Sequence, residues 1–213
     1  MKHARKTIFL LLAAIFLVST MVGCGSSQKT SSTTSLISSE QDPIPISRIG
    51  EETLQYPGEN KNYKYNVYET YVAIDEYIGS EIDVTVPEAI DDLPVKVVGG
   101  FCFNKTIKNI TLPEGIVVIE TSAFDYCEVL ESINIPENVT EIGSRAFYGC
   151  TSLKNLTIPK SVTTIGSKAF GIGDGEHGGF SPIDALIVKF YKGTAAAQYI
   201  ADSAFDINFE IIG

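Results

Sequence analysis

The sequence is poor in the residue types from which many active sites are built. Its 213 residues include no tryptophan, only two histidines and four cysteines. Because His3 and His177 are the only imidazoles, a metal site made of histidines, or a mechanism that needs two of them, is not expected. These scarcities argue against the commonest kinds of metalloenzyme and hydrolase.

Positive charge is also scarce. Sixteen lysines and arginines stand against 26 aspartates and glutamates, which gives a formal net charge of −10. A protein that binds a phosphate backbone needs a surplus of cationic side chains to neutralise it, and this chain has none. The composition therefore predicts that nucleic acid is not the partner.

Long hydrophobic runs are missing as well. The longest unbroken apolar run extends over 11 residues, Ile8 to Val18, whereas a permanent membrane-spanning helix needs roughly 20. Lys2, Arg5 and Lys6 precede this run, and small residues follow it. That order of positive, apolar and small residues is typical of an export signal.

The end of this segment, Met21-Val22-Gly23-Cys24, resembles the lipobox of bacterial lipoproteins. The resemblance implies cleavage after residue 23 and lipidation of Cys24, which would anchor the protein because several acyl chains bury enough methylenes to hold it in the bilayer. A plain secretory or a transmembrane segment is the alternative. Loss of residues 1–23 removes three basic and no acidic residues, which leaves a net charge of −13. We expect an exported protein, lipid-anchored to the bacterial membrane and facing the extracytoplasmic side or cell surface.

Residues 24–50 are predicted to form a flexible tether. Ten of the 16 residues from Gly25 to Glu40 are serine or threonine, so this stretch cannot bury enough apolar surface to order itself. A flexible chain of this length has an end-to-end distance of roughly 30 Å. The folded domain is expected to cover residues 51–213.

A period of 23 residues organises the middle of the chain. Three apolar positions recur at this spacing, which predicts a solenoid whose turns each add a short strand to a parallel sheet. The recurring positions are Ile110, Ile133 and Leu156; Ile119, Ile142 and Ile165; and Ala123-Phe124, Ala146-Phe147 and Ala169-Phe170.

The repeating unit is seen most clearly from Leu130-Glu131-Ser132-Ile133-Asn134-Ile135-Pro136 to Ile142-Gly143-Ser144-Arg145-Ala146-Phe147-Tyr148-Gly149-Cys150. It resembles the short leucine-rich repeats of the BspA-like (Treponema pallidum type) surface proteins. The resemblance implies a β-rich solenoid and a binding or adhesion role at the cell surface. The segment Leu93 to Phe103 resembles the entry turn of that family, aligned with Phe103 at the core phenylalanine position and two residues missing after it.

The two ends of the repeat region are predicted to be capped, because an end turn would otherwise expose its core. The Tyr- and Val-rich segment from Tyr63 to Ile78 is expected to form a β-cap. After Phe170, residues 171–182 form a glycine-rich insertion, and the strand-helix-strand pattern that follows resembles the C-terminal cap of the same family. Its elements are expected at 185–191, 194–203 and 207–212.

Inside the solenoid, a column of phenylalanines at 103, 124, 147 and 170 is expected to fill the core. Cys127 and Cys150 occupy equivalent places in successive turns, about 4.8 Å apart, which is within the range of a disulfide. Buried free thiols are favoured, since cysteine is among the most buried residue types. Cys102 is interpreted in the same way.

The glycine-rich insertion is the one segment that suggests small-ligand chemistry. Asp174, Glu176 and His177 could contact a cation, and the glycine spacing is reminiscent of phosphate loops. The loop does not open a helix after a strand, so phosphate binding is not predicted, and a mobile surface insertion is the favoured interpretation. We expect no cofactor, no metal and no catalytic residue, and therefore not an enzyme.

The outward positions of the predicted strands form two columns of small polar residues. Solenoids often bind partners on their concave surfaces, although exposed strand positions must be polar in any case. The columns offer no aromatic or arginine anchor, so strong affinity is not indicated. The candidate binding residues are Asp83, Thr85, Asn109, Thr111, Ser132, Asn134, Asn155 and Thr157.

The predicted function is a membrane-anchored, surface-exposed bacterial lipoprotein whose repeat domain binds an extracellular protein or glycan. The alternative is a structural or assembly component of a cell-envelope complex, acting through the β-cap or the insertion at residues 171–182. The identity of the ligand and the oligomeric state are left open by the sequence.

Overall fold

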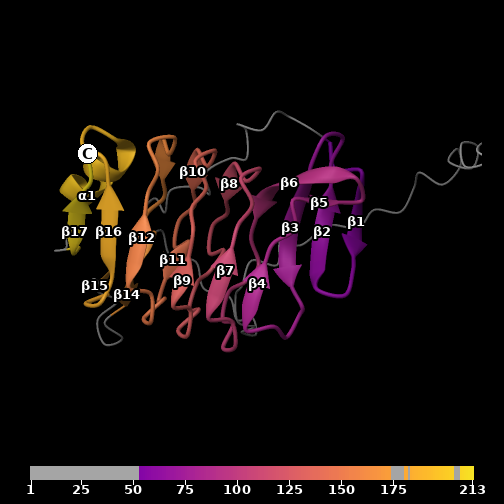
Figure 1. Ribbon diagram of the computed structural model, residues 1–213, viewed down its shortest axis with the longest axis horizontal. Helices are drawn as coiled ribbons and strands as arrows, with labels where there is room; N and C mark the ends of the chain where they lie inside the picture. Colours follow the sequence, from indigo (N-terminus) through magenta and orange to yellow (C-terminus); the bar gives the residue numbers. More distant parts are fainter. Residues whose placement is uncertain (1–52, 174–179, 182, 204–206) are drawn as a thin grey trace, which may run out of the picture.

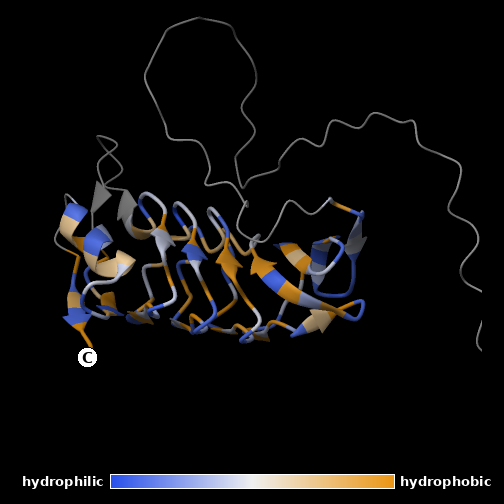
Figure 2. Ribbon diagram, turned by 90° about the horizontal axis from the view of Figure 1, so that it is seen from above, coloured by the Kyte–Doolittle hydropathy of each residue, from blue (hydrophilic) through white to orange (hydrophobic). Residues whose placement is uncertain are grey.

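The chain forms an elongated solenoid in which successive turns stack side by side along one axis (Figure 1). The computed structural model describes residues 53–173, 180–181, 183–203 and 207–213. Seen from above, each turn alternates hydrophobic and hydrophilic segments (Figure 2). One hydrophobic cluster extends through the solenoid from Tyr63 to Ile207, which confirms the fold expected from the 23-residue period.

The described elements are short strands and one helix. Their bounds are β1 Tyr56–Glu59, β2 Tyr63–Val67, β3 Val72–Tyr77, β4 Asp83–Thr85, β5 Ala89–Ile90, β6 Leu93–Val98, β7 Asn109–Thr111, β8 Val118–Ile119, β9 Ser132–Ile133, β10 Glu141–Ile142, β11 Phe147–Tyr148, β12 Asn155–Thr157, β13 Thr164–Ile165, β14 Phe170–Gly173, β15 Phe180–Ser181, β16 Ile187–Phe190, α1 Ala195–Asp202 and β17 Phe209–Ile211.

The longest sheet has the order β1-β2-β3-β6-β8-β10-β13, with β5 paired to β6. Its first three strands are antiparallel, whereas β3, β6, β8, β10 and β13 run parallel. The antiparallel strands are the predicted N-terminal β-cap. Their tyrosines Tyr63, Tyr65 and Tyr77 are buried in the core, so they cover the apolar end of the first turn.

A second set of strands forms the side of the solenoid that faces the viewer in Figure 1. It consists of two three-stranded sheets, β4-β7-β9 and β12-β16-β17. In β7, Ile110 is buried while Asn109 and Thr111 are exposed, as the alternation of side chains along a strand requires.

The third side contains the sheet β11-β14-β15. Phe147 pairs with Phe170 and Tyr148 with Gly171 in parallel register, and β14 then turns back on β15 in antiparallel register. The sequence interpretation placed a break in register after Phe170. That interpretation was wrong by one residue, because Gly171 still pairs with Tyr148 of the preceding turn, whereas Ile172 and Gly173 pair with β15.

The phenylalanine column is confirmed, with one correction at its N-terminal end. Phe101, Phe124, Phe147 and Phe170 are fully buried, and neighbouring ring centroids lie 5.3, 5.3 and 5.9 Å apart. Phe103 was expected in this column, but half of its surface is exposed. Phe101 takes the core position in its place.

The first repeat unit lacks two residues, and their position decides which phenylalanine is buried. Val98 pairs with Ile119, and Phe101 stacks on Phe124. Five positions separate Ile119 from Phe124, but only three separate Val98 from Phe101. The two missing residues therefore lie before the phenylalanine, whereas the sequence interpretation placed them after it.

Close contact between turns explains why glycine follows isoleucine in the repeat. A Cβ atom at Gly143 would lie 2.3 Å from the Thr121 nitrogen, and one at Gly166 would lie 2.2 Å from the Ser144 nitrogen. Backbone atoms of the preceding turn thus occupy the space that a side chain would need. Glycine at this position lets adjacent turns approach to the distance of a parallel sheet.

The C-terminal cap matches the predicted strand-helix-strand pattern. Thr194 caps the N-terminus of α1, where its Oγ1 accepts a hydrogen bond from the Ala197 N–H at 3.4 Å, and Ser203 caps the C-terminus. The ring of Tyr199 packs edge-on against Phe170 at 5.5 Å. The helix therefore covers the last phenylalanine of the buried column.

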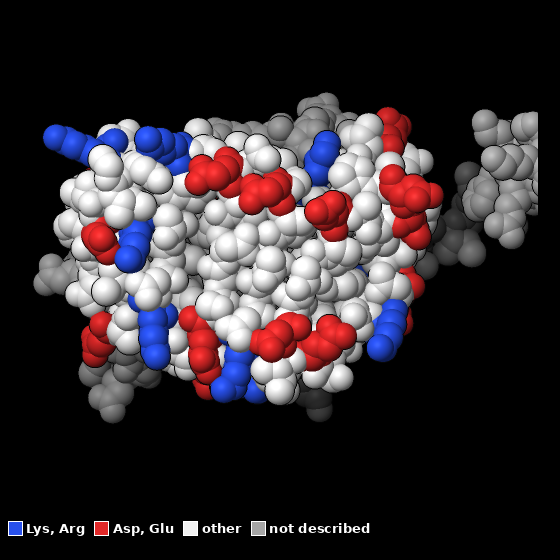
Figure 3. Space-filling model, viewed as in Figure 1, with Lys and Arg blue, Asp and Glu red and all other residues white. Residues whose placement is uncertain are grey.

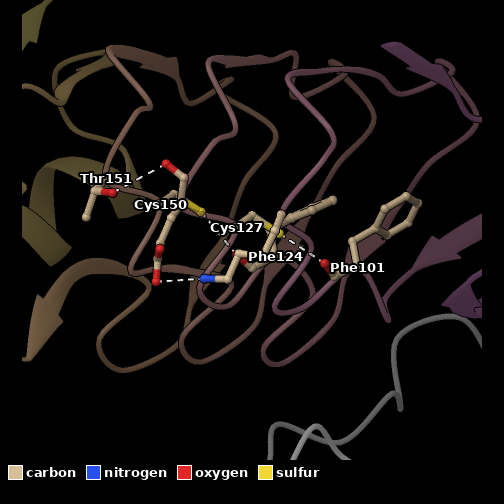
Figure 4. A network of polar contacts seen from close by, with 7 residues as sticks. Phe101, Phe124, Cys127, Cys150 and Thr151 are labelled. Atoms are coloured by element: carbon tan, nitrogen blue, oxygen red, sulfur yellow. Dashed lines mark hydrogen bonds and ion pairs between the residues drawn. The ribbon is translucent and has the colours of Figure 1, made fainter. Parts of the chain in front are cut away.

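Two cysteines form a buried column of their own (Figure 4). Cys127 and Cys150 are free thiols, and each Sγ donates to a carbonyl of the preceding turn, that of Phe101 at 3.0 Å and that of Phe124 at 3.1 Å. Burial raises the pKa of the Cys127 thiol to about 12 and that of Cys150 well above its ordinary value. Both stay protonated in the folded protein, as expected for structural thiols. Cys102 differs, because it is only partly buried, so its interpretation as a buried residue was wrong.

Several predicted features lie outside the described residues. They are the export signal, Cys24, the tether to residue 50, and the candidate cation ligands Asp174, Glu176 and His177. Within the described part of the chain, no helix is long and apolar enough to cross a membrane. The same residues contain no group of three or more histidines, cysteines or acids arranged to hold a metal ion.

Candidate binding surface

We call the outward residues of β4, β7, β9 and β12, together with Asn134, the polar face. It contains all eight residues that the sequence marked as a candidate binding surface. Parallel register places Asp83 beside Asn109 and Asn109 beside Ser132, and it pairs Thr85 with Thr111. Residues far apart in the sequence are therefore aligned in neighbouring strands.

Hydrogen bonds run along the first column of the polar face. The Asn109 Nδ2 donates to Asp83 Oδ1 at 2.6 Å, and the Ser132 Oγ donates to Asn109 Oδ1 at 2.6 Å. All three side chains are exposed. This series of hydrogen bonds holds the donors and acceptors in fixed orientations on the surface, which lowers the entropy cost of binding a partner there.

Asn134 has a structural role that the sequence did not reveal. Its Oδ1 accepts from the Leu112 N–H at 2.7 Å, and its Nδ2 donates to the Leu112 carbonyl at 2.9 Å. In other turns the equivalent N–H groups, those of Val86 and Ile158, donate to main-chain carbonyls. The side chain of Asn134 thus replaces a rung of the sheet, which explains why β9 ends at Ile133.

The polar face changes character toward the C-terminus. The strands β9 and β12 fall in separate sheets, and Asn155 pairs with the exposed Ile187. Thr157 pairs with Lys189, whose Nζ lies 2.9 Å from a carboxylate oxygen of Glu210. The small polar columns therefore extend from β4 to β12 and give way to larger side chains at β16.

Charge frames the polar face on its long borders. Figure 3 shows a central band without charged side chains, with acidic residues in rows along its margins and basic residues among them. Glu88, Glu114 and Glu137 each follow the proline that ends an outward-facing segment, and all three are exposed. Like charges that repeat at about the strand spacing of 4.8 Å favour a partner that carries positive charge.

The threonines of the second column are available for a partner. In the part of the chain that the structure describes, the exposed hydroxyls of Thr85, Thr111 and Thr157 form no intramolecular hydrogen bond. An exposed row of hydroxyl and amide groups can donate to and accept from peptide or sugar groups. It brings together no nucleophile and base, so the chemistry it offers is recognition.

Aromatic residues on the neighbouring side of the solenoid were missed by the sequence analysis. The rings of Phe103 and Tyr126 stack at 5.4 Å, and Tyr126 meets Tyr148 edge-on at 5.4 Å. The guanidinium carbon of Arg145 lies 4.1 Å from the centre of the Tyr148 ring, and its nitrogens donate to the buried Asp125 at 2.9 and 3.1 Å. Arg145 therefore cross-links two turns.

A signal for this cluster was present in the sequence. The spacing from Phe101 to Phe124 equals the period of 23, whereas that from Phe103 to Phe124 is 21. Phe101 was therefore the better match to the core column. Applied to Phe103, the same period of 23 leads to Tyr126, whose side chain is partly exposed.

The strongest electrostatic perturbation outside the cysteines is at Glu120. Burial raises the pKa of this carboxyl to about 7, and the negative charge of Asp75 adds to the effect. Asp75 lies within β3 of the long sheet, and Glu120 directly follows β8. Glu120 is thus partly protonated near neutral pH, away from the polar face.

The repeats match a known family of leucine-rich repeats. Residues 86–172 match the model of the BspA type leucine-rich repeat region in six copies. Among curated proteins the chain has no match.

The chain is similar to solved structures of leucine-rich repeat proteins, and the first of these shows the same fold. A leucine-rich cell surface protein of Faecalibacterium prausnitzii is 23% identical, with a TM-score of 0.53 over 71% of this chain, and this chain spans only 47% of that protein. The leucine-rich repeat protein of Treponema pallidum is 20% identical, with a TM-score of 0.48 over 73% of this chain and 100% of that protein. A leucine-rich repeat protein of Bacteroides capillosus is 24% identical, with a TM-score of 0.49 over 62% of this chain and 97% of that protein.

Proposed function

Because the repeat region of this chain belongs to the BspA-type leucine-rich repeats, we propose that the protein is a surface-exposed bacterial lipoprotein whose polar face binds an extracellular protein or glycan. The polar face is the observation that carries the proposal. It is an exposed band of hydroxyl and amide groups, aligned by parallel register and bordered by acidic side chains. A solenoid presents such a surface rigidly, since each turn is fixed by its neighbours.

A rigid array of this kind suits recognition better than catalysis. The Asp83–Asn109–Ser132 chain fixes its side chains before a partner arrives. The thiols of Cys127 and Cys150 are buried and protonated, so neither supplies the thiolate that a cysteine nucleophile requires. The polar face therefore offers ordered hydrogen-bonding groups, and the two buried cysteines supply no activated nucleophile.

Export and lipid anchoring complete the proposal. The apolar run from Ile8 to Val18 and the lipobox-like residues before Cys24 support them, and the similar protein of Faecalibacterium prausnitzii is a cell surface protein. A tether of residues 24–50 would hold the repeat domain away from the bilayer. Cys24 is the proposed site of lipidation.

Mass spectrometry of the protein purified in detergent from bacterial membranes tests the anchor. The expected N-terminal peptide begins at a diacylglycerol-modified Cys24, and Cys24→Ala should release the protein from the membrane fraction. An N-terminus that retains residues 1–23 would contradict the proposal.

The binding role is tested with an array of extracellular matrix proteins and glycans, probed with the same purified protein. We expect Thr111→Arg to weaken binding to a captured component by about tenfold or more, because a large side chain would occupy the centre of the polar face. The matched control is Thr121→Arg, an exposed threonine on the turn after β8. Equal binding by both variants would show that the polar face is not the contact surface.

A second candidate function is assembly into a cell-envelope complex. Its support is the outermost strand β17, where Phe209 and Ile211 are both more than half exposed. Apolar residues on an edge strand favour pairing with another protein. A stoichiometric envelope partner in pull-downs from solubilised membranes, lost in Ile211→Lys, would favour this function over external binding.

A further inference from the structure

The long sheet carries a row of outward residues that are buried. Parallel register aligns Ala73, Val97, Val118 and Glu141 across four neighbouring strands, and each of them is between 1% and 7% exposed. We call these four residues the outer row. The residue that follows each of them on its strand belongs to the main core, so the outer row itself points away from that core.

The polar face shows how an uncovered row of the same solenoid differs. Its outward residues, such as Asn109 and Thr111, are exposed. The apolar members of the outer row instead form a hydrophobic cluster of their own, separate from the main core, which includes Tyr71. The strands packed on β8 are β6 and β10, which lie beside it in the sheet and not over its outer face. The burial of the outer row therefore indicates a cover over this face.

The chain enters the described domain at one end of the outer row. The Gln55 N–H donates to the Val67 carbonyl at 2.8 Å, and the Tyr68 N–H donates to the Tyr71 carbonyl at 2.9 Å. Two hydrogen-bonded steps thus lead from the start of β1 to Tyr71, which belongs to the outer cluster. The residues that directly precede Thr53 therefore start beside the face that needs a cover.

The composition of these preceding residues suits them to cover an apolar row. Three isoleucines lie within residues 44–49, whereas leucine and isoleucine occur only at Leu36 and Ile37 between residues 25 and 40. Pro43 and Pro45 have no N–H to donate to a sheet ladder, so this segment is better suited to lie across the strands than to join the sheet as a strand.

The length of the segment matches the width of the sheet. Five strand spacings separate β1 from β10 in the sheet order, which is about 24 Å at about 4.8 Å per spacing. Arg48 precedes Gln55 by seven residues, and seven extended residues span about 24 Å. An extended chain that crosses the strands from β1 therefore brings Arg48 to β10, where Glu141 lies.

The charges of the two parts are complementary. Arg48 is the only basic residue between Lys29 and Lys61. Glu141 is a buried carboxylate of the outer row, and a charge taken out of water is stabilised by an opposite charge beside it. Asp75 and Glu120 follow members of the outer row by two positions, so they add negative charge on the same side of the sheet.

From this arrangement we propose that residues 44–50 lie extended across the outer face of the long sheet as a strap, whose isoleucines cover Val97 and Val118 and whose Arg48 pairs with Glu141. The occupant of the outer face is thus a segment of the chain itself. Burial of its isoleucines stabilises the strap by roughly 25 cal/mol per Å² of area removed from water.

The strap sets how the domain faces the membrane. The long sheet and the polar face lie on different sides of the solenoid (Figure 1). A chain that leaves along the long sheet therefore does not cross the polar face, which stays open to a partner. This consequence rests on the proposed anchor at Cys24 and shortens the free tether to residues 24–43. The strap itself does not depend on the anchor.

Limited digestion with trypsin tests the strap on the full chain purified in detergent. Between Cys24 and Lys61 trypsin has two sites, Lys29 and Arg48, and the strap holds only the second. Mass spectrometry of early time points gives the ratio of cleavage at Arg48 to cleavage at Lys29. A synthetic peptide of residues 25–52, which lacks the sheet, gives the intrinsic ratio of the two sites.

We expect this ratio to be about tenfold or more lower in the protein than in the peptide, because a docked segment is cleaved only when it opens. Ile46→Ser and Glu141→Gln should each raise cleavage at Arg48 several-fold. The matched controls are Ile37→Ser, in the serine-rich stretch, and Glu137→Gln, an exposed carboxylate one turn segment before β10, and neither should change the ratio. Thermal unfolding of each variant verifies that it is folded.

Three results would overturn the strap. They are an equal ratio in protein and peptide, protection of Arg48 that persists in both Ile46→Ser and Glu141→Gln, and protection that is lost on dilution of the protein. The last would assign the outer face to a second copy of the chain. The digestion needs neither the lipid nor a ligand, so its failure leaves the proposed function untouched. An array without a bound component would leave the strap standing.

Discussion

The buried interior of the solenoid and its outer surface are made from the same turns, yet they follow the 23-residue period differently. Inside, Phe101, Phe124 and Phe147 repeat the same residue at ring distances of 5.3 Å. Outside, equivalent positions differ from turn to turn, as Phe103, Tyr126 and Gly149 do. An inward side chain packs against its own counterparts, so one residue type satisfies every turn, whereas an outward side chain meets solvent or a partner. Specific function is therefore to be sought where the period fails.

The largest effect should come from the interior. Phe147→Ala is expected to lower the free energy of unfolding by about 3–5 kcal/mol, because the ring is fully buried between two others and its loss leaves a cavity. Urea denaturation gives the value. Phe103→Ala, on the outer surface, should cost about 1 kcal/mol or less. Similar costs for the two variants would remove the distinction between the interior and the outer surface.

The glycines of the repeat should show the next largest effect. Gly143→Ala would place a Cβ 2.3 Å from the Thr121 nitrogen, and we expect a cost of about 1–3 kcal/mol or more, since two turns must separate. Gly115→Ala is the control, because its Cβ would meet only the Val95 carbonyl oxygen at 3.3 Å. A thermal unfolding series on both variants decides whether close approach of the turns, rather than glycine content, sets stability.

A smaller effect is expected where an outer residue acts structurally. Asn134→Ala removes two hydrogen bonds to the main chain of Leu112 and should cost about 1–2 kcal/mol. Thr157→Ala, in the neighbouring turn of the same face, should change stability by less than about 0.5 kcal/mol. If chemical denaturation gives the same loss in the free energy of unfolding for both variants, the Asn134 side chain does not replace the missing sheet hydrogen bond at Leu112. Variants of Asn134 are for this reason poor probes of binding.

The smallest effect concerns Glu120 and depends on pH. Its pKa in the folded protein, about 7, lies above its usual 4.5, so the folded state holds the proton more tightly than the unfolded state. The free energy of unfolding should therefore fall as pH rises from about 4.5 to about 7. In Glu120→Gln the fall in the free energy of unfolding over this pH range should be smaller by on the order of 1 kcal/mol, because the Glu120 side chain is partly exposed.

Stability curves at several pH values measure this slope. Glu114→Gln, which removes an exposed carboxylate at the margin of the polar face, is the control. An unchanged slope in Glu120→Gln would show that another group is responsible for it. A steeper slope would mean that folding lowers the pKa of Glu120 instead of raising it.

Most of the fold could be predicted from the sequence, because a fixed period constrains many residues at once. The strands around Ile110, the helix that begins after Thr194 and the free thiols of Cys127 and Cys150 lie where the repeat and the cap pattern placed them. The first unit was harder. It is two residues short, and an alignment anchored on Val98 and Gly99 can place that gap on either side of the phenylalanine. Only strand register, Val98 beside Ile119, fixes it before Phe101.

The candidate surface was predicted in composition but not in detail. Alternation along a strand identified Asn109 and Thr111 as outward, since side chains point to opposite faces in succession. It did not show that Asn134 turns back onto Leu112 or that Asp83, Asn109 and Ser132 bond in series. Those contacts join residues 22 to 26 positions apart, and hydrogen-bond geometry between turns cannot be obtained from periodicity.

The sequence by itself determined the solenoid, its period, its caps and the acidic, histidine-poor character that argues against phosphate backbones and histidine-based chemistry. These follow from spacing and composition, which need no knowledge of neighbours in space. The tertiary structure decided which of two nearby phenylalanines is buried, which asparagine supports the sheet, and how the side chains of the polar face bond to one another. Each of these depends on how one turn lies against the next, and a difference of two residues in turn length is enough to exchange a core side chain for a surface one.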